Sequence, residues 1–212
     1  LARGQVAGAM VVGQVTGDSP FTTHRIQLLT GIANQAALAV EGAMLLAAQQ
    51  EEAWVSTALL QVAQSVAGQP LEVGLETAAR LTPILVGVER VAIYQYDRAT
   101  GGFRLRQVTG LDRETAARLQ ARVIALSDLG LTRMDPLLAT QPPWAIVLPP
   151  LLVRLFGRDR VGVWPLRAPG DILGALVTEA VPQLGRRQTI LDGIAHQLAM
   201  ALENDRLAHE VA

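Results

Sequence analysis

The 212-residue sequence contains no cysteine. This absence excludes disulfides, thiolate metal ligands, cysteine nucleophiles and chromophores attached through a thioether. Aromatic residues make up only 4% of the chain, and its 18 basic and 19 acidic residues form no basic face or arm. Because nucleic-acid binding needs clustered basic side chains against phosphates, we expect no nucleic-acid partner.

Patterns for catalysis and metal binding are also missing from the sequence. His24, His196 and His209 have no second histidine at metal-ligand spacing. Serine, histidine and aspartate occur, but no Gly-x-Ser-x-Gly motif places them together, and the glycines form no phosphate-binding loop. We therefore predict no catalytic residue, no metal and no cofactor in this chain.

Two apolar stretches, 31–48 and 136–156, are long enough to raise the question of a membrane span. The first is rich in alanine and contains Asn34, Gln35 and Glu41. The second is interrupted by several prolines, which cannot continue a helix. We expect a soluble, cytoplasmic chain that does not contact a membrane.

An internal repeat organises the chain. Residues 4–12, GQVAGAMVV, align with residues 170–178, GDILGALVT, and both are apolar, strand-like runs with an internal glycine. Residues 29–41, LTGIANQAALAVE, align with residues 191–203, LDGIAHQLAMALE. The repeated unit is a strand, a polar loop and an amphipathic helix, which predicts the end of one domain followed by a second, complete domain.

Between the two copies the sequence favours a single helix over about 22–67, because apolar residues recur at spacings of three and four. We divide the chain into the last strand and helix of a preceding domain (1–45), a helical connector (46–67) and a complete domain (52–212). Residues 1–20 lack the other strands of their sheet, so we expect them to be weakly anchored or paired with another chain.

The long helix carries an apolar stripe that would be exposed in a monomer. We therefore expect a homodimer held by this helix and by the last helix of the chain. The candidate contact residues in the long helix are Ile26, Leu29, Ala33, Val40, Trp54 and Leu59.

The complete domain alternates helical and strand-like segments. Strands are predicted over 90–96, 103–109, 161–166 and 172–180. Asp112 is placed to cap a helix that reaches about residue 123, and residues 127–150 are irregular and rich in proline. The other helices are predicted over 71–85, 151–156 and 186–211.

These segments together resemble the GAF domain family. The resemblance is carried by RVAIYQYD at 90–97, by VWPL at 163–166 with LGAL at 173–176, and by GIAHQLAMALEN at 193–204. It implies an α+β fold in which the first and last helices cover one face of an antiparallel sheet, while other helices and loops enclose a ligand pocket on the opposite face. It also implies a non-catalytic sensor region of a larger bacterial signalling protein, such as the histidine kinase of a two-component system or a regulated phosphatase.

The residues narrow the choice among members of this family. Bilin-binding members and members that reduce methionine sulfoxide use cysteine, so this chain would be phytochrome-like without the chromophore cysteine. The Asn-Lys, Phe and Asp-Glu signature of cyclic-nucleotide-binding members is not assembled here. Two functions stay open, a sensor for an unidentified small molecule and a ligand-free relay and dimerisation module, with an enzyme of unrecognised type as a more distant alternative.

The predicted ligand site lies between the sheet and residues 127–156, because residues 127–150 form a stretch too long for a simple connection. Alternation along 90–96 places the two tyrosines on the face opposite Val91 and Ile93. Packing in the core is the alternative role for all the aromatic candidates, and Arg167 could supply a counter-charge to an acidic ligand. The candidate ligand-binding residues are Tyr94, Tyr96, Trp144, Trp164 and Arg167.

Overall fold

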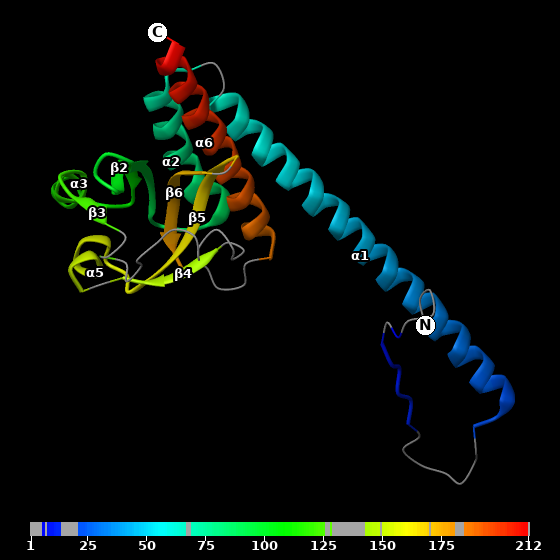
Figure 1. Ribbon diagram of the computed structural model, residues 1–212. Helices are drawn as coiled ribbons and strands as arrows, with labels where there is room; N and C mark the ends of the chain where they lie inside the picture. Colours follow the sequence, from blue (N-terminus) through cyan, green and yellow to red (C-terminus); the bar gives the residue numbers. More distant parts are fainter. Residues whose placement is uncertain are drawn as a thin grey trace. The chain divides into compact units, whose positions relative to one another are not determined.

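The computed structural model of the chain describes residues 6, 8–13, 21–66, 69–125, 128, 143–148, 150–169, 171–180 and 185–211. The chain divides into two compact units, Leu1–Trp54 and Val55–Ala212 (Figure 1). The boundary falls inside one helix, so each unit contains part of it. All described strands and the remaining described helices belong to the second unit.

Helix α1 (Thr23–Val66) has 44 residues and confirms the long helix expected from the sequence. In the first unit most of its side chains are exposed, among them Ile26 and Val40. The helix is long and apolar enough to cross a membrane by length and composition, which for a single helix is weak evidence of a span. Residues 8–13, part of the expected first strand, are exposed and pair with no strand in the described part of the chain.

The second unit is built around a six-stranded sheet with the order β3-β2-β1-β6-β5-β4, in which every neighbouring pair is antiparallel. Its four long strands were all expected from the sequence. They are β1 (Val91–Asp97), β2 (Gly102–Thr109), β5 (Arg160–Ala168) and β6 (Asp171–Glu179).

The two edge strands correct the sequence-based expectation. β3 (Val123–Ala125) begins where a helix was expected to end, and β4 (Trp144–Val147) lies in the stretch expected to be irregular. Three or four residues are too short to show a convincing period of two. Pairing with β2 and β5 supplies the order that the local sequence does not reveal.

One face of the sheet is covered by α2 (Leu71–Val86), α6 (Gly185–Val211) and the part of α1 within the second unit. Their apolar side chains form a buried core with Ile93, Trp164 and Leu176 of the sheet. Leu59 of α1 is partly buried and packs against this core within one chain. The close approach depends on Gly193, where a β-carbon would lie only 2.4 Å from a methyl group of Leu59.

The opposite face is covered by α3 (Arg113–Gln120) and α5 (Pro150–Phe156). As expected, Asp112 caps α3, because its carboxylate accepts a hydrogen bond of 2.9 Å from the Thr115 amide. Hydrogen bonds from the Thr115 hydroxyl and amide also hold the pKa of Asp112 below its usual range. α5 ends at Gly157, which adopts a left-handed φ of 71°.

Candidate ligand pocket

A cavity of about 60 Å³ lies between the sheet and the helices α3 and α5. Among the described residues that line it, Tyr94 carries the only polar side-chain group, its hydroxyl. A cavity needs only about 10–15 Å³ to hold a single water molecule, so this cavity is larger than one water requires. The lining residues are Tyr94, Phe103, Leu119, Ile124, Ile146, Leu148, Leu152, Phe156, Val161, Val163, Ala175 and Val177.

The period of two along the strands brings these side chains to one face. Tyr94 of β1 lies directly opposite Ala175 of β6 in the register of the sheet. Because alanine fills little space beside the tyrosine ring, this pairing helps to leave the sheet hollow at its centre. Leu119 of α3 and Phe156 of α5 close the cavity from above the sheet.

Tyr94 is buried at the wall of the cavity. Burial raises the pKa of Tyr94 far above its ordinary value, so the side chain is a neutral phenol in solution. A neutral hydroxyl can both donate and accept a hydrogen bond. The cavity therefore offers one polar group to a ligand and otherwise only apolar contact.

The other tyrosine shares this face but lies outside the cavity. Tyr96 packs on Phe103 with ring centroids 5.2 Å apart and is half-buried. Val91 and Ile93 belong to the helix-covered core instead, as the alternation predicts. Trp144 lies in β4 opposite Val163, and its side chain is outside the described residues.

The structure corrects the placement of Trp164 and Arg167. Trp164 follows the cavity-lining Val163 and therefore points to the opposite face, where it is 1% exposed within the helix-covered core. Arg167 is exposed and lines a separate hollow together with Trp164, Asp192 and His196. Neither residue lies against the cavity. Counting the alternation along β5, as was done for β1, would have separated Trp164 from the tyrosines.

Asp192 lies beside the Trp164 indole on the helix-covered face. Burial raises the pKa of Asp192, and the neighbouring indole opposes that rise. Even so, Trp164 Nε1 and Asp192 Oδ1 are both buried without a partner that meets hydrogen-bond geometry. This arrangement leaves two unsatisfied polar atoms at the contact between β5 and α6.

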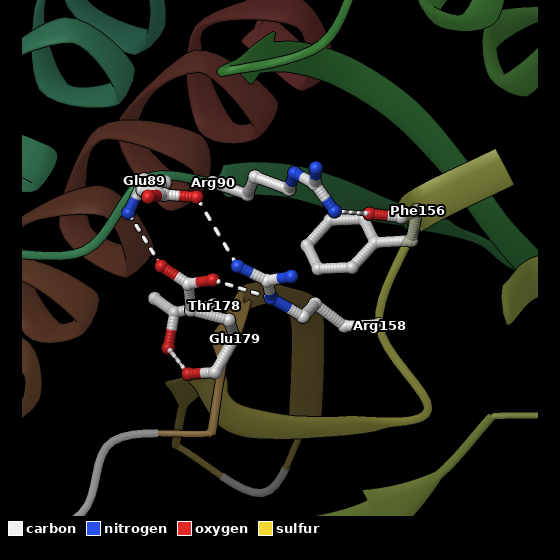
Figure 2. Close-up of polar contacts among 6 residues, drawn as sticks. All are labelled: Glu89, Arg90, Phe156, Arg158, Thr178 and Glu179. Carbon is white, nitrogen blue, oxygen red and sulfur yellow. Dashed lines mark hydrogen bonds and ion pairs between the residues drawn. The ribbon is translucent and has the colours of Figure 1, made fainter.

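A polar cluster joins the cavity wall to the end of the sheet (Figure 2). Arg90 Nη1 donates a hydrogen bond of 2.6 Å to the carbonyl of Phe156, the last residue of α5. Arg158 donates to Glu179 at 2.9 Å and to Glu89 at 3.1 Å, and the Glu89 amide donates to Glu179 at 2.5 Å. Since Glu89 and Arg90 follow shortly after α2, the cluster connects both faces of the sheet.

The charges in this cluster stabilise one another. The hydrogen bond and charge of Glu179 raise the pKa of Arg158. Burial acts to raise the pKa of Glu179, but the hydrogen bonds from Glu89 and Arg158 and the nearby positive charges lower it overall. No local pattern in the sequence could have shown the cluster, because Glu89 and Glu179 are 90 residues apart.

Among the described residues no group of three or more histidine, aspartate or glutamate side chains could hold a metal ion. No family model and no curated protein matches the chain. Similarity to solved structures therefore carries the comparison with known proteins.

The second unit has the same architecture as several solved domains. The GAF domain of a proposed sensor histidine kinase from Pseudomonas syringae pv. tomato aligns at 20% identity and a TM-score of 0.57, over 79% of this chain and 97% of that one. The chain has the GAF fold. A GAF domain of a phosphoenolpyruvate-protein phosphotransferase from Coxiella burnetii aligns at 17% identity and a TM-score of 0.57, over 74% and 96% of the two chains. The phycoerythrobilin-bound GAF domain of a cyanobacterial phytochrome aligns at 16% identity and 0.52, over 75% and 97%.

Proposed function

We propose that this chain is a non-catalytic sensory module whose GAF domain binds a small, mainly apolar molecule. The apolar cavity with a single buried hydroxyl, that of Tyr94, is the observation that carries the proposal. Ligand sites are mostly apolar, with few polar groups that fix orientation. Similarity to the GAF domains of a proposed sensor kinase and a phytochrome supports a signalling role.

The chemistry of the cavity limits the ligand. A charged molecule would lose its hydration without gaining a counter-charge from the described lining residues, because none of them is ionised. Water alone is also a poor occupant, since a buried water typically makes about three hydrogen bonds and the described lining residues offer one polar side chain. A few carbon atoms with one hydrogen-bonding group directed at Tyr94 fit these limits.

The polar cluster offers a route from the cavity to the helices. A ligand that displaces Phe156 would act on the hydrogen bond between its carbonyl and Arg90. Glu89 and Arg90 lie just beyond α2, which packs against α6 in the core. We propose that occupancy of the cavity shifts α2 and α6, and that a homodimer formed through long helices passes this shift to an output domain.

Native mass spectrometry of the chain purified from a bacterial host tests the sensor proposal. We expect a retained small molecule in the wild type and its loss in Ala175→Leu, because leucine fills the space opposite Tyr94. Ala117→Leu makes the same change on the exposed surface of α3 and should keep the molecule. Absence of any bound mass in the wild type would favour the alternative of a ligand-free relay.

A conservative pair of variants tests the role assigned to the hydroxyl. Tyr94→Phe removes one hydrogen bond without changing the shape of the cavity, so affinity should fall by about 1 kcal/mol, roughly fivefold. Tyr96→Phe is the matched control, because this side chain lies on the same face but outside the cavity. Equal affinities of the two variants in a titration would remove the hydroxyl from the proposed site.

A further inference from the structure

The first half of α1 repeats the sequence of α6, so the burial of α6 indicates what the corresponding face of α1 is built to contact. Six apolar side chains of α6 are 0 to 4% exposed: Leu191, Ile194, Ala195, Leu198, Ala199 and Leu202. The residues of α1 aligned with them are also all apolar: Leu29, Ile32, Ala33, Ala36, Ala37 and Val40. The face that α6 uses to cover its sheet is therefore preserved in α1.

In α1 this face has no cover within the described residues. Ile32 is 55% exposed and Val40 is 42% exposed, whereas their counterparts Ile194 and Leu202 are buried. The polar positions agree as well, because Asn34 of α1 corresponds to His196, which is exposed on α6. The two helices thus share an inner apolar face and an outer polar position.

A conserved glycine within the repeat points to a helix as one neighbour of this face. At Gly193 a β-carbon would lie 2.4 Å from a methyl group of Leu59, so the glycine lets α6 approach α1 without displacing this side chain. Gly31 occupies the same position in the first copy, yet a β-carbon there would meet nothing within 4 Å. An unconstrained glycine inside a helix costs about 1 kcal/mol relative to alanine, so its presence needs a reason.

A second glycine points to a strand as the other neighbour. At Gly174 of β6 a β-carbon would lie 2.1 Å from the carbonyl oxygen of Tyr94 in the adjacent strand. Gly8 is its counterpart in the repeat, and there too nothing lies within 4 Å. A helix from a second copy of α1 would account for the apolar stripe of α1 but not for the glycine in the strand segment.

We infer that residues 4–12 and the apolar face of α1 over residues 29–40 complete a second domain of the same fold. The sheet and first helix that cover them are supplied by a segment of the same protein upstream of Leu1. Leu29, Ala33 and Val40 then contact that sheet, which replaces their assignment to a homodimer contact. This inference rests on the repeat and is independent of the proposed ligand.

Cysteine labelling tests the inference cleanly, because the chain has no native cysteine. Ala33→Cys lies on the inner face and Asn34→Cys on the outer one, and each is compared in the 212-residue chain and in the full-length natural protein. Ala195→Cys and His196→Cys provide the reference, because the ratio of their maleimide labelling rates is the ratio expected for a covered and an exposed position. We expect maleimide to label Ala33→Cys at least about tenfold more slowly in the full-length protein, with no change at Asn34→Cys.

Two outcomes overturn the inference. Equal labelling of Ala33→Cys and Asn34→Cys in the full-length protein means that nothing covers the inner face. Protection that disappears on dilution assigns the face to a second copy of the chain. Substitution at the glycine gives an independent readout: Gly31→Val should lower the Tm of the full-length protein but not that of the 212-residue chain, and an unchanged Tm in both contradicts the inference.

Discussion

The contact between Gly193 and Leu59 allows a quantitative test of how α6 packs on α1. In Gly193→Ala the new methyl group would lie 2.4 and 2.8 Å from the two methyl carbons of Leu59. Overpacking of this kind costs about 1–3 kcal/mol. Alanine in place of glycine inside a helix stabilises by about 1 kcal/mol. The net expectation is a loss of up to about 2 kcal/mol in the free energy of unfolding.

A double-mutant cycle separates these two effects. Leu59→Ala alone should cost about 2 kcal/mol, the lower end for leucine truncation, because Leu59 is only partly buried. In that background the clash disappears, so Gly193→Ala should become stabilising by about 1 kcal/mol. The coupling between the two sites is then about 1–3 kcal/mol, within the range found for residues in contact.

Urea unfolding followed by circular dichroism measures the four free energies of the cycle. Ala117→Leu, on the exposed surface of α3, serves as a control that should leave the unfolding midpoint nearly unchanged. If Gly193→Ala changed stability equally in both backgrounds, the two helices would not be packed through this contact. The assignment of Leu59 to the core of the domain would then fail.

Three further variants examine the sheet and its polar contacts. Gly174→Ala should destabilise by at least about 3 kcal/mol in the same assay, because its β-carbon would meet the backbone of β1 and not a flexible side chain. Burial raises the pKa of Asp192, so the folded protein loses stability as the pH rises through that pKa and the carboxyl ionises. Asp192→Asn should therefore be more stable than the wild type at neutral pH and should lose this advantage in acid. A stability difference that stays constant across a pH series would contradict this sign. Arg158→Met should change stability little, because the side chain is 44% exposed and solvent weakens its ion pairs. The variant should weaken any effect of a cavity ligand on the hydrogen exchange of α2 amides, and an unaltered exchange response would separate the cluster from signalling.

The sequence predicted those elements whose signals are local. The neighbouring strands over 90–96 and 103–109, the cap at Asp112 and the helix over 71–85 each depend on a few adjacent residues, and the structure contains all of them. The edge strands were missed because only their partners in the sheet order them. The helix that begins at Asp112 was drawn too long, since it ends at Gln120 and β3 follows.

The candidate site was predicted only where alternation was applied. Tyr94 lines the cavity, and the alternation of side chains along β1 had placed it on that face of the sheet from the sequence alone. Trp164 was grouped with Tyr94 because both are aromatic, although the alternation of side chains along β5 places Trp164 on the other face of the sheet. Most of the cavity wall consists of ordinary aliphatic residues such as Val161 and Leu152, which no sequence motif distinguishes from other core positions.

The contact at Gly193 also bears on the choice between a sensor and a relay. The helix that enters the second unit and the helix that ends it touch directly at this glycine, without any ligand between them. A rotation of one helix would therefore displace the other even when the cavity is empty. We therefore expect a ligand to adjust the strength of this contact between the helices, so that an occupied and an empty domain would differ in degree and not in kind.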